Sequence, residues 1–317
     1  MTRLFLVLKP GLFTTVQDLG RLGYLKYGVP ASGAMDQFSL VAANLLVGNQ
    51  LSDACLETTL IGPELQVLSE TQIAVTGAAC SSRINGKTVP MWRTLRAKKG
   101  DVVSFGNVQN GCRTYLSARG GINVPLVLGS RSTYARGGFG GLDGGPLRNG
   151  DTIESLGASP LTVEYSMPEE LVPQFADRVE ARVVLGPQAD MFTDAGVETF
   201  LSGLFRVTAE ADRMGYRLDG PTIEHKGRAD IVSDALLPGA VQVPKNGRPI
   251  LVMREAQTTG GYPKIAVVIS PDLSLLGQAK PGSSIKFSKV SLSRAQKESR
   301  EFLKLLKRLS SMLVENQ

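Results

Sequence analysis

The chain has 317 residues, 42% of them hydrophobic and 20% charged, so it is long enough for one large or two ordinary domains. This composition excludes a disulfide-stapled miniprotein and a largely disordered chain. The formal net charge is +6, but six cations and two anions between residues 294 and 308 contribute +4 of it. Because no DNA-binding motif or aromatic-interleaved basic stripe accompanies this charge, the sequence predicts no nucleic-acid partner.

Neither the cysteines nor the first residues indicate secretion. Cys55, Cys80 and Cys112 are odd in number and form no Cys-x-x-Cys pattern, so we predict neither a disulfide framework nor a metal site. The apolar run 4–8 is too short for a signal-peptide core, and no apolar run approaches 18 residues. We therefore expect a soluble, cytoplasmic protein that binds no membrane.

The periodic segments predict a mainly β fold with a few short helices. The first helix begins after Asp36, which can cap it, and ends at Gly48. Alternating apolar and polar residues between turn-forming residues predict the strands. In chain order, the strands lie at 65–76, 102–105, 114–118 and 182–185, a second helix spans 190–201, and further strands lie at 204–209, 240–243, 250–253 and 265–269.

The last segment, 293–313, has apolar residues at helical spacing opposite its cations. The apolar positions are Phe302, Leu305, Leu306, Leu309 and Leu313. We expect an amphipathic helix that packs on the body of the protein or on a partner subunit, in preference to a membrane surface.

Two short elements recur in the same order along the chain. Residues 21–24 resemble residues 213–216, which lie 192 positions later, and residues 97–105 resemble residues 279–287, 182 positions later. The similar offsets suggest a duplication, although glycine turns followed by strands also recur by chance. We therefore predict a first β-domain at 1–180, a related second β-domain at 181–290 and a C-terminal basic helix at 291–317.

Several familiar motifs do not indicate function here. The NGKT run at 85–88 lacks the glycine of a phosphate-binding loop and is better interpreted as a hairpin turn. The glycine-rich run 137–141 lacks the strand and helix that flank a dinucleotide site. His225 is the single histidine, and no Gly-x-Ser-x-Gly elbow accompanies it, so we expect it in a loop or at a strand end.

Polar residues embedded in glycine remain as candidate ligand contacts. Glycine lets the backbone approach a ligand closely, and arginine binds carboxylate or phosphate through two parallel hydrogen bonds. Arg21, Arg131, Arg136 and Arg213 lie in such settings and suit a small anionic substrate. The alternative is that the glycines mark turns while arginine and aspartate pair to brace the loops.

These clusters resemble the signature of the 5-oxoprolinase C-subunit family, also called KipA-like, allophanate hydrolase subunit 2 or biotin-dependent carboxyltransferase-like. The motifs that carry the resemblance are QDLGR at 17–21, GVPASGAMD at 28–36, GSRSTY at 129–134, GPQ at 186–188, DRMGYRL at 212–218 and QTTGGYP at 257–263. They stand in the family's order, and the resemblance as a whole extends from about residue 10 to residue 287.

The resemblance implies two cyclophilin-like β-barrel domains and a hetero-oligomeric enzyme. It implies ATP-dependent hydrolysis of 5-oxo-L-proline to L-glutamate with the B subunit (KipI-like) and the A subunit, the ATP being bound by the complex and not necessarily by this chain. We expect Asp18, Arg21, Asp36 and Arg213 to act in catalysis. We expect substrate contacts from Ser32, Arg131, Ser132, Arg136, Asp212, Gln257, Thr258, Thr259 and Tyr262. Asp18, Asp36 or Asp212 could orient a proton or a metal, and the sequence does not choose between them.

Two other functions remain open at this point. One is carboxyl transfer from carboxybiotin, as in urea carboxylase; no lysine follows a methionine here, so another chain would have to carry the biotin. The other is a KipA-like binding module that antagonises a histidine-kinase inhibitor. In the enzyme hypothesis we expect no activity from the chain alone, because its candidate nucleophiles are hydroxyls and thiols without a paired histidine.

Overall fold

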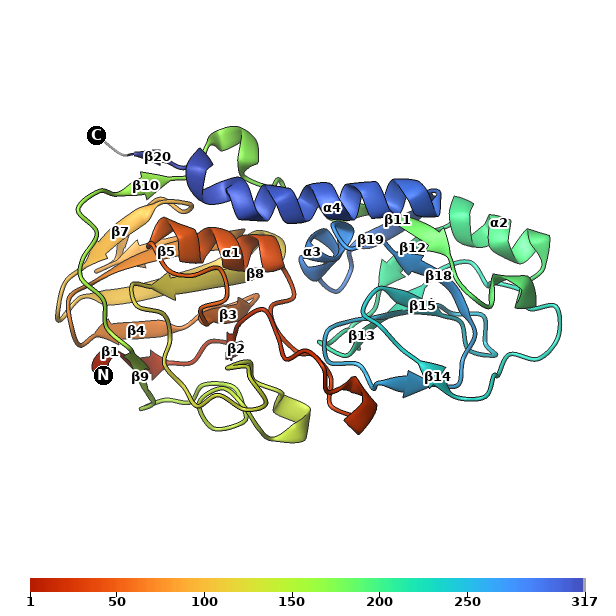
Figure 1. The fold of residues 1–317 in the computed structure, drawn as a ribbon, viewed down its shortest axis with the longest axis horizontal. Coiled ribbons are helices and arrows are strands. Elements are labelled where there is room, and N and C mark those ends of the chain that lie inside the picture. Colours follow the sequence, from red (N-terminus) through yellow and green to blue (C-terminus); the bar gives the residue numbers. More distant parts are fainter. Residues whose placement is uncertain (316–317) are drawn as a thin grey trace. The chain divides into compact units, whose positions relative to one another are not determined.

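The computed structural model describes residues 1–315, and their contacts divide the chain into two units (Figure 1). The first unit contains residues 1–21, residues 32–175 and the C-terminal residues from Leu305 onward. The second unit contains residues 22–31 and 176–304. The division falls after Phe175, close to the predicted boundary at residue 180. Residues 316–317 of the predicted C-terminal segment lie outside the described residues.

The first unit is built on a nine-stranded sheet in which β2, β3, β8, β4, β1 and β9 are neighbours in that order. The long strand β5 pairs with β6, β7 and β8. The elements of the sheet and its helix are β1 (Thr2–Lys9), β2 (Phe13–Gln17), α1 (Gln37–Leu46), β3 (Cys55–Thr59), β4 (Glu64–Val67), β5 (Thr71–Ile84), β6 (Lys87–Thr88), β7 (Thr94–Ala97), β8 (Val102–Ala118) and β9 (Thr152–Ser155). Shorter pieces are η2 (Ala135–Gly137), β10 (Tyr165–Ser166), η3 (Glu169–Leu171), η5 (Leu309–Met312) and β20 (Val314–Glu315).

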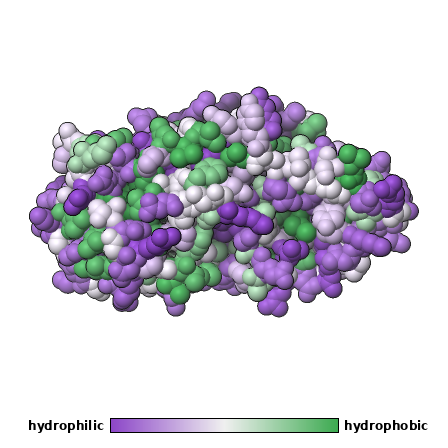
Figure 2. All heavy atoms as spheres, turned by 90° about the horizontal axis from the view of Figure 1, so that it is seen from below, coloured by the Kyte–Doolittle hydropathy of each residue, from purple (hydrophilic) through white to green (hydrophobic). Residues whose placement is uncertain are grey.

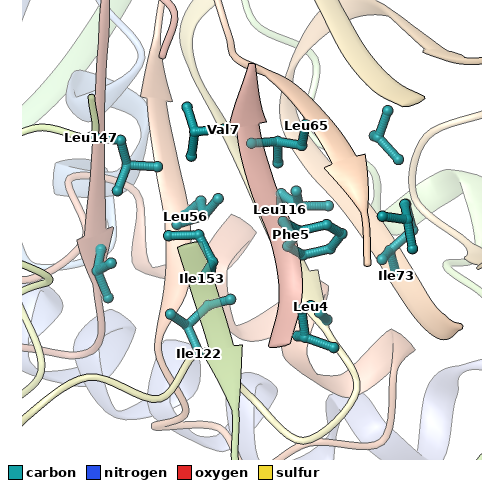
Figure 3. Packing of buried hydrophobic residues seen from close by; sticks show 14 of the residues in the cluster. Leu4, Phe5, Val7, Leu56, Leu65, Ile73, Leu116, Ile122, Leu147 and Ile153 are labelled. Carbon is teal, nitrogen blue, oxygen red and sulfur yellow. The ribbon is translucent and has the colours of Figure 1, made fainter. Parts of the chain in front are cut away.

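Alternate residues of these strands form the core of the first unit. Figure 3 shows Phe5 and Val7 of β1 among side chains from neighbouring strands, including Leu56, Leu65 and Leu116. All of these side chains are buried. The period-two alternation of the strands therefore directs one face of the sheet into a continuous apolar cluster.

Helix α1 begins as the sequence predicts. The Asp36 carboxylate accepts hydrogen bonds from the Ser39 N–H at 3.1 Å and from the Ser39 hydroxyl at 2.6 Å. Gly48 follows the helix with a φ of +64°, a conformation in which a side chain is strained. The Thr76 hydroxyl of β5 donates to the Ser39 carbonyl at 2.6 Å and ties the helix to the sheet.

We expect Asp36→Ala to lower the free energy of unfolding by about 1 kcal/mol, because it removes the acceptor at the helix start. Urea unfolding followed by circular dichroism measures the change. Asp36→Ser keeps an acceptor and should retain most of the stability, and equal losses in both variants would contradict a capping role.

The second unit contains a closed barrel of seven strands in the order β11, β18, β15, β16, β13, β12 and β19. Its strands are β11 (Arg178–Leu185), β12 (Leu204–Val207), β13 (Gly215–Asp219), β15 (Ala240–Gln242), β16 (Ile250–Val252), β18 (Lys264–Val268) and β19 (Ser284–Lys289). The remaining elements are η1 (Leu25–Tyr27), η4 (Ala189–Met191), α2 (Asp194–Ser202), β14 (Asp234–Ala235), β17 (Thr259–Gly260), α3 (Asp272–Gly277) and α4 (Leu292–Arg308), the last of which extends into the first unit. The prediction of a mainly β fold with short helices is confirmed.

Three aromatic rings anchor α2 to the barrel. Phe200 of α2 stacks on Phe287 of β19 at a centroid distance of 4.6 Å, and Phe205 of β12 lies 6.0 Å from Phe287. The predicted amphipathic C-terminal helix is present as α4, in which Leu306 is buried while the cations of its last turn are exposed. It ends at Arg308, earlier than the predicted residue 313, so Leu309 belongs to η5 and Leu313 follows it.

The repeated element at 97–105 and 279–287 has the same local geometry in both places. In each copy, the N–H of a glycine with positive φ donates to the backbone carbonyl of a valine on the neighbouring antiparallel strand. A third copy of this turn lies at 148–151. The glycine–valine pairs are Gly100 with Val67, Gly150 with Val7 and Gly282 with Val207, each at 2.8 Å. The other repeated pair differs, because residues 22–24 precede η1 whereas Gly215 begins β13.

The surface is mixed in character. On the face drawn in Figure 2, hydrophilic and hydrophobic residues are interspersed. Within residues 1–315, no helix has the length and apolar character needed to cross a membrane.

Candidate functional site

Asp18 follows directly after β2, and its carboxylate holds in place the glycine-rich loop at residues 129–141. Oδ1 accepts hydrogen bonds from the Gly20 N–H at 2.8 Å and from the Ser130 and Ser132 hydroxyls at 2.7 and 2.5 Å. Oδ2 accepts from the Arg131 N–H at 2.6 Å. Since these contacts use both oxygens of a buried carboxylate, Asp18 is suited to positioning the loop rather than to proton transfer.

Arg21 is buried and contacts the same loop. Its guanidinium donates to the Ser132 carbonyl at 2.5 Å and lies 5.0 Å from the centre of the Phe139 ring. Gly140 makes this approach possible, because a Cβ there would lie 2.2 Å from the Ser132 carbonyl oxygen. Arg21 therefore braces the loop through a hydrogen bond and a cation–π contact.

Ser32 lies on a loop packed against Asp18. The N–H of Ala34 donates to the Asp18 carbonyl at 2.9 Å, and Gly33 allows the close approach because a Cβ there would lie 2.8 Å from the Gly20 nitrogen. Ser32 itself is fully buried with a φ of +52°, and its hydroxyl has no hydrogen-bond partner among the described residues.

A buried carboxylate holds the end of this loop. Glu57 Oε2 accepts from the Met35 N–H at 2.9 Å and from the Tyr115 hydroxyl at 2.7 Å, and Arg113 lies 3.8 Å from Oε1. The Tyr115 hydroxyl in turn accepts from the Asp36 N–H at 2.8 Å. Burial and the Glu57 charge raise the pKa of Tyr115 well above its ordinary value, so the phenol stays protonated. The Asp36 side chain thus caps α1, and its backbone N–H binds Tyr115.

The two other arginines of the loop differ in exposure. Arg131 is half-buried and its Nε donates to the Val124 carbonyl at 3.1 Å, whereas Arg136 on η2 is exposed. Tyr134 and Phe139 meet edge to face at 5.4 Å and fix the loop between them. Of the predicted contacts in the first unit, Arg136 is therefore the cation most accessible from solvent.

In the second unit, Arg213 forms a buried ion pair. Its Nε donates to Glu255 Oε1 at 2.6 Å, and the Glu255 N–H donates back to the Arg213 carbonyl at 2.8 Å. Both side chains are about 5% exposed. Asp212 Oδ1 accepts from the N–H groups of Met214 and Gly215 at 2.8 and 3.1 Å and closes a turn. This geometry matches the bracing alternative for both residues.

The QTTGGYP segment is partly exposed and is not part of the barrel. Thr258 is half-buried, and its carbonyl accepts from the Leu236 N–H at 2.9 Å. The next two residues of the segment form β17, which pairs with β14 in a separate two-stranded sheet. The exposed side chains of this segment are Gln257, Thr259 and Tyr262.

A buried lysine follows this segment directly. Lys264 Nζ lies 2.7 Å from Asp234 Oδ2, and the Lys264 N–H donates to Gln188 Oε1 at 3.2 Å. Gly186 is required beside it, because a Cβ there would lie 2.2 Å from the Lys264 carbonyl oxygen. The Lys264 hydrogen bond is the main cause that holds the pKa of Asp234 below its ordinary value.

The predicted residues thus form two groups, one in each unit. The first group contains Asp18, Arg21, Ser32, Arg131, Ser132 and Arg136, with Asp36 at the end of the Ser32 loop. The second contains Asp212, Arg213, Gln257, Thr258, Thr259 and Tyr262. The sequence prediction did not include Glu57, Asp234 and Lys264. For Lys264 the available signal was a charged residue directly before the apolar run of a short strand.

His225 and Cys55 are engaged in packing and burial. His225 lies in a loop, which is one of the two predicted settings; its ring is 4.7 Å from that of Phe192 at a tilt of 36°, and its Nε2 lies 3.0 Å from the Val243 carbonyl oxygen. Burial raises the pKa of Cys55 to about 12. Over residues 1–315, no group of His, Cys, Asp and Glu side chains could hold a metal ion.

The fold and the motif loops are those of a known class of protein domain. The chain belongs to the carboxyltransferase domain family with subdomains A and B, whose family model matches residues 27–289. Within it, the chain is 38% identical over 291 residues to the C subunit of 5-oxoprolinase from Escherichia coli K12, covering 92% of this chain and 93% of that protein.

Larger proteins contain a similar part. The chain is 36% identical over 322 residues to urea amidolyase of Lachancea kluyveri, which covers 94% of this chain but 18% of that protein. The crystal structure of the Kluyveromyces lactis urea amidolyase matches with a TM-score of 0.91 at 33% identity, covering 98% of this chain and 20% of that one. The chain therefore spans less than a quarter of these urea amidolyases.

Proposed function

We propose that the chain is the C subunit of an ATP-dependent 5-oxoprolinase and hydrolyses 5-oxo-L-proline to L-glutamate together with the A and B subunits. The observation that carries this proposal is the 38% identity to the C subunit of E. coli 5-oxoprolinase, which extends over more than nine tenths of both proteins. The similarity to urea amidolyases is confined to a small part of those chains.

The chemistry of this reaction calls for exposed hydrogen-bond donors, and each unit has at least one among the predicted residues. Opening an unstrained lactam requires the loss of amide resonance, and phosphorylation of the lactam oxygen at the expense of ATP would create a better electrophile. Cationic and amide side chains stabilise the charge that develops on oxygen. Arg136 in the first unit and Gln257 in the second are exposed side chains of this kind.

The proposal includes a partner subunit because the candidate catalytic groups of this chain are protonated or already engaged in contacts. With a pKa of about 12, the buried Cys55 is a neutral thiol at physiological pH and a poor nucleophile. Asp18 and Arg213, which the sequence suggested for catalysis, are engaged in bracing contacts. This supports a site that is completed by a different polypeptide.

The test is an omission experiment with the three subunits. We expect ADP release that depends on 5-oxo-L-proline from the complete complex, and no turnover when this chain is left out or assayed alone. Undiminished turnover by the A and B subunits without the chain would contradict the proposal, as would turnover by the isolated chain.

Carboxyl transfer is the second candidate, favoured by the family model itself and by the TM-score of 0.91 to a urea amidolyase. It would require a biotin carrier on another chain. The two candidates predict different substrates for the same complex, which makes them separable by assay.

A further inference from the structure

Lys264 occupies an unusual position for a lysine. It belongs to the barrel strand β18 and its side chain is 5% exposed, yet its ammonium group contacts a carboxylate that is 53% exposed. Removing an ammonium group from water is costly unless it is paired. The pair is therefore asymmetric: the cation is fixed inside the barrel wall, and the anion reaches it from the solvent side.

The anion lies on a segment that is not part of the barrel. Asp234 is in β14, which forms a two-stranded sheet with β17, and the segment before it is mostly exposed, with Val232 at 92%. The backbone is attached nearby by the Ile231 N–H, which donates to the Gly261 carbonyl at 2.8 Å, and by the Leu236 N–H, which donates to the Thr258 carbonyl at 2.9 Å. Displacing the Asp234 side chain would cost the hydrogen bond that its Oδ1 accepts from the Ala235 N–H at 2.8 Å, but it would leave the hydrogen bonds between the barrel strands in place.

The residue that carries the cation, in contrast, has its backbone fixed within the barrel. The Lys264 backbone is clamped by Gln188 and by its pairing with Gln242 of β15, whose side chain is buried and donates to the Tyr262 carbonyl at 3.2 Å. Such fixed surroundings preorganise an ammonium group for one incoming carboxylate. The exposed side chains of the QTTGGYP segment lie immediately before it in the chain.

We propose that the Lys264 ammonium group recognises the carboxylate of a small ligand, and that Asp234 occupies this position until the ligand displaces it. The inference rests on the proposed function in one respect, because 5-oxo-L-proline carries one carboxylate on an uncharged lactam ring. The exchange replaces one carboxylate by another, so the buried ammonium group stays paired throughout. Asp234 returns to water, where a carboxylate is well hydrated.

The test measures kcat and KM for 5-oxo-L-proline with the complete complex. Lys264→Met should raise KM about tenfold to a hundredfold, because a charge-assisted hydrogen bond is lost. We expect a much smaller change in kcat, since the carboxylate contact is made equally in the ground state and the transition state. Asp234→Asn should lower KM about threefold or more, because it weakens the internal competitor.

A second ion pair of the same unit provides the matched control. Lys280 lies 3.1 Å from Asp177 in a more exposed setting, and Lys280→Met should leave KM unchanged. An unchanged KM in Lys264→Met, with reduced thermal stability, would show that the pair only fastens the β14 segment. If Lys264→Met does not fold, an unchanged KM in Asp234→Asn would overturn the inference.

Failure of the proposed function is distinguishable from failure of this inference. If the wild-type complex does not turn over 5-oxo-L-proline, the isolated chain is titrated with glutarate and with its neutral diamide by calorimetry. We then expect binding of glutarate alone, weakened at least tenfold in Lys264→Met. No binding of glutarate to the wild type, or equal binding to the variant, would overturn the inference.

Discussion

Asp18→Asn is expected to lower the free energy of unfolding by about 2–4 kcal/mol, because the new amide presents a donor where the carboxylate accepts hydrogen bonds from the loop. Ser130, Arg131 and Ser132 all donate to this side chain. Urea unfolding followed by circular dichroism measures the loss, and we expect the activity of the complex to fall with the order of the loop.

The control for this variant is Asp143→Asn, which changes an exposed aspartate of the same loop region. It should alter stability by less than about 0.5 kcal/mol. A fully stable Asp18→Asn protein that has lost all activity would contradict the positioning role and would indicate a catalytic carboxylate instead.

Arg213→Ala is expected to lower the free energy of unfolding by about 3–5 kcal/mol, because it leaves Glu255 buried without its cation. The same denaturation measurement applies. The double variant Arg213→Met with Glu255→Leu should recover much of the loss, since it removes both buried charges.

The exposed pair Arg217–Glu210 is the matched control, with side chains 61% and 72% exposed and an N–O distance of 2.7 Å. Arg217→Ala should cost at most about 1 kcal/mol. If Arg213→Ala is as stable as Arg217→Ala but inactive in the complex, Arg213 contacts substrate and the bracing interpretation is wrong.

The sequence was sufficient for elements defined by local signals. Asp36 caps α1, and the two-residue loop Asn85–Gly86 joins β5 to β6 with both φ angles positive, as predicted. In contrast, 102–105 and 114–118 were predicted as separate strands but belong to the single strand β8. The polar stretch between them is held extended by pairing with β5, which local periodicity does not reveal.

The candidate site was predictable in its loops but not in the roles of its residues. Glycine and arginine identify the segments where the chain turns and carries charge, and the structure shows why Gly33 and Gly140 are required. Whether Arg21 or Arg213 meets a ligand or a neighbouring loop depends on partners far away in the chain. Lys264 and Asp234 were missed for the same reason, because they are 30 residues apart and meet only in the folded barrel.

The most direct test of the central claim compares substrates for one complex of this chain with the A and B subunits. Glutamate release from 5-oxo-L-proline and ATP is measured beside ATP use with urea and bicarbonate in the presence of a biotin carrier. We expect glutamate release that requires this chain, and no use of ATP that depends on urea. Turnover of urea without glutamate release from 5-oxo-L-proline would contradict this claim and assign the chain to carboxyl transfer.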